Sequence, residues 1–296
     1  MKLFLIDGTY ELFRTYYGAP SAFSPSGVEV GAVRGLLRSL FALMRDERPD
    51  FIAAAFDHEI ESFRNKLFDG YKTGEGIEHA LLAQFSLAEA AVSLLGITVW
   101  PMLEFEADDA LATAAARFAS HPSIEQVLLC SPDKDLAQCV EGDKVVMWDR
   151  KQARFYNEAG VVEKFGVSPA SIPDYLALVG DSADGIPGVP RWGAKSSAAV
   201  LAKYQSIERI PRELTDWQLK VRGAESLVKS LCEHESEVTL YKQLATLRRD
   251  VPLQEELDDL RPKPIDLKQA EAFLQEIGDT RFLSQLTSFL STRPSQ

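Results

Sequence analysis

Short apolar runs recur along the first half of the chain, and several of them end in acidic residues. The clearest are residues 3–7 closing with Asp7, residues 51–56 followed by Asp57, and residues 127–130 followed by Asp133 and Asp135. Continuous apolar runs of this length predict buried parallel strands. Because ligands bind outside the carboxyl ends of the strands in such sheets, we expect the acids to gather at one edge.

Segments with helical spacing alternate with these runs. The predicted helices are residues 31–45, 79–95, 110–119 and 267–276, and further short strands are predicted at residues 97–100 and 145–148. From about residue 157 onward the chain reads as mainly helical. This alternation predicts an α/β domain with a largely parallel sheet, which we place at residues 1–178, followed by a helical region at residues 179–296.

Residues 180–195 combine acidic side chains with a turn rich in glycine and proline. Asp181 and Asp184 are three positions apart, so in a helical turn they point the same way. A helix is predicted to begin near Gly193. Backbone N–H groups in such a turn and at a helix N-terminus form a natural anion site, so this stretch joins acidic ligands to a predicted phosphate contact.

The composition of the 296-residue chain is that of an ordinary globular protein, with 46% hydrophobic residues and a net charge of −12. Taken by sign alone, that charge argues against nucleic acid as a partner. Clustered carboxylates, however, hold divalent cations, and a bound cation reverses the local field. Hard oxygen ligands suit Mg²⁺ or Mn²⁺ rather than zinc, so the acids predict such a site.

Two further features bear on location. The chain has no run of about 18 apolar residues and no signal-peptide pattern, so no membrane association is expected. Its three cysteines are unpaired in spacing, which suits a reducing cytosol, and a cytoplasmic protein is expected.

The motifs, taken together and in order, resemble the 5′→3′ exonuclease and flap-endonuclease family, in particular the N-terminal nuclease domain of bacterial DNA polymerase I. The matching segments are LFLIDGTYELFR, AAFDHEIESFRNKLFDGYK, EFEADDALAT, SPDKDLAQ and LVGDSADGIPGVPRWGAKSSAAVL. They cover most of residues 1–205. The resemblance implies a PIN-like α/β domain followed by a helix–hairpin–helix variant, the H3TH element. No polymerase part follows within the sequence, so a free-standing nuclease is expected.

The resemblance also implies a set of functional residues. The acids that match the family's two-metal site, for two or more Mg²⁺ or Mn²⁺ ions, are Asp7, Asp57, Glu106, Asp108, Asp109, Asp133, Asp135, Asp181 and Asp184. Arg64 and Lys72 match positions that steer phosphate during catalysis. The expected DNA-binding residues are Arg14, Gly188, Val189, Arg191, Gly193, Lys195 and Ser196, with a monovalent cation such as K⁺ at the hairpin.

By the same resemblance, the protein is expected to be a 5′→3′ exonuclease and structure-specific flap endonuclease. It would hydrolyse phosphodiester bonds in DNA with a 5′ end, flap or nick, during DNA replication and repair. We expect it to act as a monomer in functional partnership with a DNA polymerase.

Three residues depart from the family pattern. Glu75 stands where the family has an arginine, so the gateway over the site is less basic and threading of a single strand is called into question. Arg191 replaces a hairpin glycine, which alters the duplex grip if the position needs a positive φ. Gly185 replaces an asparagine.

Three alternatives compete with this interpretation. A haloacid-dehalogenase-type phosphatase is suggested by the sequence Ile6-Asp7-Gly8-Thr9, but it needs a nucleophilic aspartate at position 5, which is Leu5. A PIN-like ribonuclease would keep the fold and change the substrate. A catalytically silent protein that binds branched DNA is the third, and the complete acid set argues against it.

Overall fold

A six-stranded sheet organises residues 1–291, the part of the chain that the computed structural model describes. Its strands are β1 (Lys2–Asp7), β2 (Phe51–Asp57), β3 (Thr98–Met102), β4 (Gln126–Cys130), β5 (Val145–Asp149) and β6 (Arg154–Tyr156). Their order across the sheet is β3-β2-β1-β4-β5-β6, and only β6 runs antiparallel to its neighbour. The predicted, largely parallel sheet is therefore confirmed, and β6 adds an edge strand that the apolar pattern did not indicate.

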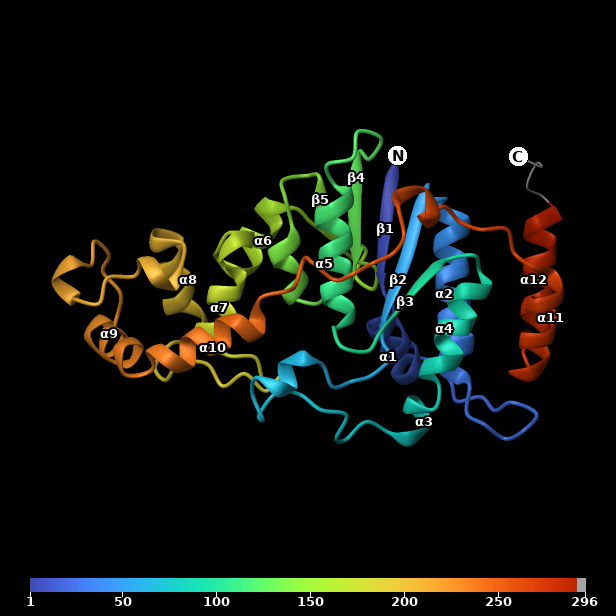
Figure 1. The fold of residues 1–296 in the computed structure, drawn as a ribbon, viewed down its shortest axis with the longest axis horizontal. Helices are drawn as coiled ribbons and strands as arrows, with labels where there is room; N and C mark the ends of the chain where they lie inside the picture. Colours follow the sequence, from blue (N-terminus) through green and yellow to red (C-terminus); the bar gives the residue numbers. More distant parts are fainter. Residues whose placement is uncertain (292–296) are drawn as a thin grey trace.

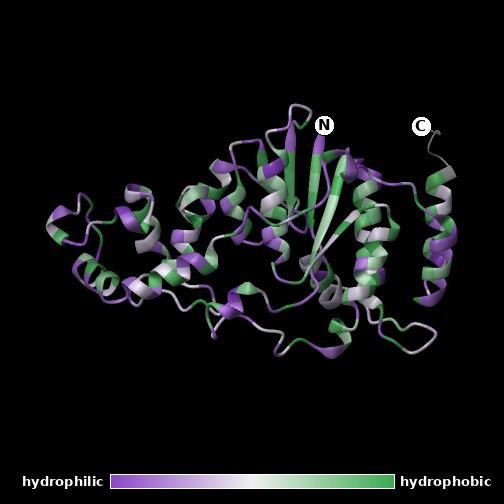
Figure 2. Cartoon of the chain, viewed as in Figure 1, coloured by the Kyte–Doolittle hydropathy of each residue, from purple (hydrophilic) through white to green (hydrophobic). Residues whose placement is uncertain are grey.

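Helices cover both faces of this sheet. Those of the first half are α1 (Gly8–Gly18), α2 (Gly31–Glu47), α3 (His79–Leu82), α4 (Phe85–Leu94) and α5 (Ala107–Phe118). Side chains alternate along a strand, so Phe4 and Ile6 of β1 pack with α2 and α4, whereas Leu3 and Leu5 pack with α5. In Figure 2 the strands are mostly green, which marks the hydrophobic residues that these two layers enclose.

The second half of the described chain is mainly helical, as expected. Its helices are α6 (Glu158–Phe165), α7 (Ile172–Val179), α8 (Ala194–Tyr204), α9 (Ala224–Glu233), α10 (Glu235–Ala245), α11 (Leu267–Glu276) and α12 (Thr280–Ser291). Figure 1 shows α7 to α10 extending away from the sheet, whereas α11 and α12 lie on its far side, next to α2 and α4. There, the rings of Phe282 and Phe41 are 5.3 Å apart in an edge-on arrangement. Residues 292–296, the end of the predicted helical region, lie outside the described part.

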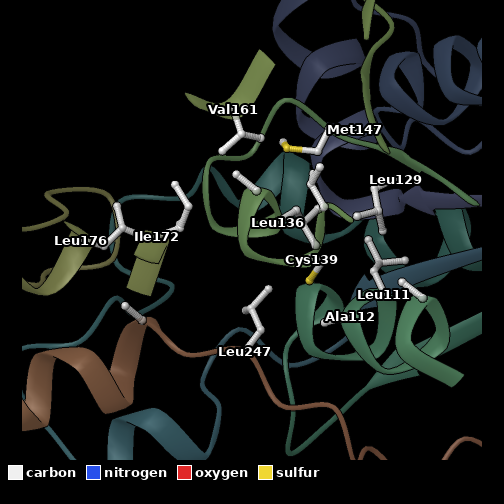
Figure 3. Close-up of a cluster of buried hydrophobic side chains, with 14 of the residues drawn as sticks. Leu111, Ala112, Leu129, Leu136, Cys139, Met147, Val161, Ile172, Leu176 and Leu247 are labelled. Carbon is white, nitrogen blue, oxygen red and sulfur yellow. The ribbon is translucent and has the colours of Figure 1, made fainter. Parts of the chain in front are cut away.

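One apolar core joins the sheet to the helical half (Figure 3). Leu129 and Met147 from β4 and β5 meet Leu111 of α5, and Ile172 of α7 and Leu247, which follows α10, belong to the same cluster. These side chains are buried, so the helical half is held against the sheet by hydrophobic contact. Among the helices of residues 1–291, none combines the length and apolarity that a membrane crossing requires.

The single helix predicted for residues 79–95 is wrong. The structure has two helices, α3 and α4, with a turn at residues 83–84. The buried side-chain amide of Gln84 in this turn accepts from the N–H of Val33 in the first turn of α2 (3.2 Å) and donates to the carbonyl of Ala80 (3.0 Å). The bend is thus set by a contact with another helix, which the apolar spacing of residues 79–95 does not encode.

Candidate functional site

The predicted acids meet at the carboxyl edge of the sheet. Asp7 and Asp57 end β1 and β2, and Glu106, Asp108 and Asp109 lie at the start of α5. The remaining four acids follow β4 or lie in the turn after α7. The pairing of β1 with both β2 and β4 brings these ends side by side. The sheet therefore assembles in space the carboxylates that the sequence places in separate motifs.

Three of these acids form a compact cluster. Asp135, Asp181 and Asp184 are all buried, and each offers a carboxylate oxygen within 4.8 Å of the other two. The Oδ1 atom of Asp135 is buried without a hydrogen-bond partner. An unpartnered anionic oxygen is costly inside a protein, and an all-carboxylate donor set is the one that Mg²⁺ or Mn²⁺ prefers. The residues present therefore fit a divalent cation.

The neighbouring acids share the electrostatic field of this cluster. Burial, together with the charges of Asp57 and Asp133, raises the pKa of Asp7 to about 7, even though Tyr10 N–H and Ser131 Oγ–H each donate to its carboxylate at 2.8 Å. Burial and the charge of Asp133 likewise hold the pKa of Asp135 well above its ordinary value. Carboxylates that repel one another in this way are stabilised by a cation.

Two lysines lie against the cluster. The Lys72 ammonium is 3.0 Å from a Glu106 oxygen and 2.9 Å from an Asp184 oxygen, and its side chain keeps 33% of its surface exposed. Lys134 makes a 2.6 Å ion pair with Asp181. Although burial opposes it, the charges of Lys72 and Arg64 lower the pKa of Glu106 to about 2. Glu106 is therefore ionised throughout the neutral range.

Arg64 and Asp109 are not at the open side of this site, contrary to what the sequence predicts. Arg64 is 1% exposed, and its guanidinium donates twice to the fully buried Asp109, at 2.7 and 2.8 Å. Its Nε donates to the carbonyl of Leu244 (2.8 Å) and its Nη2 to that of Thr246 (3.2 Å). In this position Arg64 joins α5 to the C-terminal end of α10, and it has no free donor directed at a phosphate.

The predicted DNA-binding turn follows Asp181, which forms a bridge with Ile186. Gly193, Lys195 and Arg191 are exposed, and α8 begins directly after Gly193, as expected. The Ser196 hydroxyl accepts from the N–H of Gly193 (3.0 Å) and caps the helix.

Other members of the predicted DNA-binding set are engaged within the protein. Val189 is buried and donates its N–H to the carbonyl of Leu178 (2.9 Å), so this N–H does not face outward as the hairpin interpretation assumed. Gly188 has φ +75°, and a Cβ there would come within 2.5 Å of the Gly180 nitrogen, so only glycine fits. Arg14, on α1, is half-buried and pairs with the fully buried Glu11 and with Ser39.

The position of Arg191 yields a stability prediction. Arg191 has φ +73°, a left-handed conformation that costs side-chain-bearing residues roughly 1–2 kcal/mol. Arg191→Gly removes that strain, whereas Arg191→Ala removes the same charge and keeps the strain. Glycine also raises the conformational entropy of the unfolded chain, which offsets part of this gain. We therefore expect Arg191→Gly to be about 0.5–1 kcal/mol more stable than Arg191→Ala in urea unfolding. Equal stability of the two variants would contradict a strained backbone at this position.

The acidic cluster yields a second prediction, on metal and pH. Because its pKa is raised in the fold, Asp7 stays protonated in the metal-free protein between about pH 4 and 7, where the unfolded chain has lost this proton. The contribution of Asp7 to the free energy of unfolding therefore falls as pH rises through this range. A cation binds the deprotonated form. Saturating Mg²⁺ should therefore raise the melting temperature more at pH 8 than at pH 6. At roughly 100 times the Kd that applies at pH 8, binding adds about 2.7 kcal/mol to the free energy of unfolding. Asp135→Asn should lose most of this gain; the same gain at both pH values would be contrary to the prediction.

Several residues that support the site were not predicted. Ser131 donates to Asp7, Ser62 Oγ–H donates to Glu106 (2.7 Å), and Tyr71 O–H donates to the same carboxylate at 3.3 Å. Lys134 pairs with Asp181. Each lies within or beside a motif that was singled out, and that proximity was the only signal available in the sequence.

Two family models together match residues 2–278 of the chain. The family model for the 5′-3′ exonuclease N-terminal, resolvase-like domain matches residues 2–166, and that for the 5′-3′ exonuclease C-terminal SAM fold matches residues 167–278. The chain is similar to the 5′-3′ exonuclease of Aquifex aeolicus, at 32% identity over 96% of the chain and 94% of that protein. It is also similar to DNA polymerase I of Mycobacterium leprae, at 36% identity over 89% of the chain, but it spans only 29% of that longer relative.

Solved structures agree on the fold. The T5 D15 protein, co-crystallised with metal ions, superposes with a TM-score of 0.66 at 17% identity, covering 98% of this chain and 99% of that one. The catalytic core of Rad2 in complex with a DNA substrate superposes with a TM-score of 0.61 at 13% identity, covering 96% of this chain and 90% of that one. The predicted α/β sheet domain followed by a helical region is confirmed.

Proposed function

Because this chain belongs to the 5′→3′ exonuclease family and is a nuclease, we propose that it hydrolyses phosphodiester bonds of DNA near a 5′ end, nick or flap, with divalent metal ions. The observation that carries the proposal is the cluster of Asp135, Asp181 and Asp184 with Lys72 beside it. Carboxylates that hold cations next to an ammonium group are suited to a substrate whose reacting group is a phosphate.

The proposed roles follow from position. Asp135, Asp181 and Asp184 would hold one cation, and Asp7, Asp108 and Asp133, whose charges act on one another, would contribute to a second. When bound, Mg²⁺ or Mn²⁺ ions supply a water nucleophile of lowered pKa and positive charge for the leaving oxygen. Lys72, half-exposed between Glu106 and Asp184, would bind the scissile phosphate.

The helical region is proposed to bind the duplex. The exposed Lys195 and Arg191 at the N-terminal end of α8 are placed for phosphate contacts, and K⁺ at the turn before α8 remains part of the proposal. We keep the division into residues 1–178 and 179–296 as a proposal. A monomer acting in the cytoplasm, in partnership with a DNA polymerase, is likewise proposed, since the relatives include polymerase I proteins.

The test is a substrate panel. Cleavage of 5′-labelled nicked, flapped and single-stranded DNA and of matched RNA is measured with Mg²⁺, with Mn²⁺ and with a chelator. We expect cutting of DNA that the chelator abolishes. Cutting of RNA alone would replace the proposal with the ribonuclease alternative, and binding of branched DNA without cutting in either metal would establish the silent binder.

A further inference from the structure

The segment between β2 and α3, residues 58–78, lies over the candidate site. We call it the strap. Figure 1 shows it in blue to cyan, running beneath the carboxyl ends of the strands toward α10 and then back to α3. Apart from the one-turn 3₁₀ helix of residues Phe63–Lys66, it contains no helix. Whatever reaches the acids from this side must pass the strap.

The first part of the strap is held on two sides. The N–H of Glu59 donates to the carbonyl of Met102 (3.1 Å) and that of Phe63 to the carbonyl of Glu104 (2.9 Å), which ties the strap to the end of β3 and to the loop before α5. On the other side, the Phe68 ring lies 6.1 Å from that of Tyr241 on α10. The buried Arg64 side chain reaches the same end of α10. This part therefore follows the protein surface and does not stand away from it.

The strap is also fastened to the turn that bears the acids. Lys72 donates its backbone N–H to the carbonyl of Asp184 (2.9 Å), and its ammonium pairs with the Asp184 carboxylate. Gly185 makes this approach possible. A Cβ at that residue would lie 2.1 Å from the carbonyl oxygen of Gly70, and its φ is +75°. The presence of glycine at position 185 is thereby explained by close contact with the strap.

The exposed charges of the strap are mostly negative. Its exposed acids are Glu59, Glu61, Asp69, Glu75 and Glu78, whereas its one exposed basic residue is Lys66. The other two basic residues, Arg64 and Lys72, are paired with carboxylates. A single strand carries a phosphate at every nucleotide, so a strand drawn along this surface would meet net repulsion.

We propose that the strap makes the enzyme select 5′ ends that remain base-paired or have a very short displaced strand, and reject long single-stranded flaps. The half-exposed Lys72 offers a positive charge for one phosphate at the acids, while the surface beyond it repels the phosphates that would follow. The substrate class would then be nicked and recessed duplex ends, shortened from the 5′ terminus. This inference rests on the proposed function.

Cleavage and binding test the inference separately. The kcat/KM is measured for matched duplexes with a nick, a one-nucleotide flap and a 20-nucleotide flap, and Kd is measured for the nick and the long flap with a chelator present. We expect kcat/KM to be at least tenfold higher for the nick than for the long flap, and no affinity gain from the added single strand. Equal cleavage, or tighter binding of the long flap, overturns the inference. If none of the DNA substrates were cleaved, the proposed function would be overturned instead. The comparison of Kd values for the nick and the long flap would then still decide the inference about the strap.

Charge reversal tests the cause. Glu61→Lys with Glu75→Lys changes two exposed strap acids, and the control Glu271→Lys with Glu276→Lys makes the same charge change on α11. We expect the strap variant to cut the long flap about fivefold faster at low salt, with nick cleavage unchanged, and the gain to shrink as salt rises. An equal gain in the control, or none in the strap variant, contradicts the electrostatic argument.

Hydrogen exchange tests the closed strap without any cleavage. The Lys72 amide, which is bonded to the Asp184 carbonyl, should exchange much more slowly than the amides of residues 73–76 in the free protein. Exchange of Lys72 as fast as in an unstructured peptide would show that the strap is open, and would overturn the inference.

Discussion

Replacing Asp135 with asparagine is expected to lower the rate of DNA cleavage on the order of 10³-fold, equal to about 4 kcal/mol of transition-state stabilisation. Asp135 belongs to the carboxylate cluster and has the buried oxygen without a partner. Asparagine keeps the shape and removes the charge, so the proposed cation loses a ligand while the fold and the proposed duplex contacts at α8 are unchanged. Single-turnover cleavage of a nicked duplex in Mg²⁺ measures the change.

Binding and a matched variant complete that experiment. Affinity for the same duplex with a chelator present should stay within about threefold of the parent, because the proposed duplex contacts at α8 are unaltered. Glu276→Gln removes an exposed carboxylate on α11, outside the acidic cluster, and should cleave normally. Near-parental cleavage by Asp135→Asn would show that the cluster does not hold the catalytic cation.

Replacing Arg64 with alanine is expected to destabilise the fold by about 3–5 kcal/mol, because it leaves the buried Asp109 charge without its partner. Both side chains are buried, and the two hydrogen bonds between them measure 2.7 and 2.8 Å. The carbonyls of Leu244 and Thr246 lose their donors as well. Urea unfolding of the metal-free protein gives the change in the free energy of unfolding directly.

The neighbouring Lys66 provides the control. It is exposed on the same one-turn helix, so Lys66→Ala should change stability by less than about 0.5 kcal/mol. If Arg64 instead acts on phosphate, as its position in the sequence motif suggested, Arg64→Ala would retain the parental stability and lose only cleavage rate. The two roles are therefore separated by one unfolding curve.

The gathering of the acids was predictable because it follows from topology. Two apolar runs end in Asp7 and Asp57, and a third is followed closely by Asp135. These runs become parallel strands, and the carboxyl ends of parallel strands meet at one edge of the sheet. The start of α8 after Gly193 was predictable for a similarly local reason, since glycine and serine favour a helix start. Each of these features begins from a local pattern: an apolar run with an acid at its end, or a glycine before a helix start.

The rest depends on contacts between distant parts of the chain. Arg64 is buried because the carbonyls of Leu244 and Thr246, about 180 positions away, complete its hydrogen bonds. The bend at Gln84 depends on Val33 of another helix, and the fastening of the strap depends on Gly185 lying against Gly70. No local pattern of apolar and polar residues contains these pairings, so a motif can identify a basic residue without revealing that it is internal.

We infer that the carboxylates at the carboxyl edge of the sheet hold the catalytic metal. Anomalous diffraction from crystals soaked in Mn²⁺ tests it most directly, because the signal locates the ion independently of any substrate. We expect a peak bounded by Asp135, Asp181 and Asp184, and its disappearance in crystals of Asp135→Asn. A well-ordered crystal with Mn²⁺ bound elsewhere and none at these three residues would contradict it.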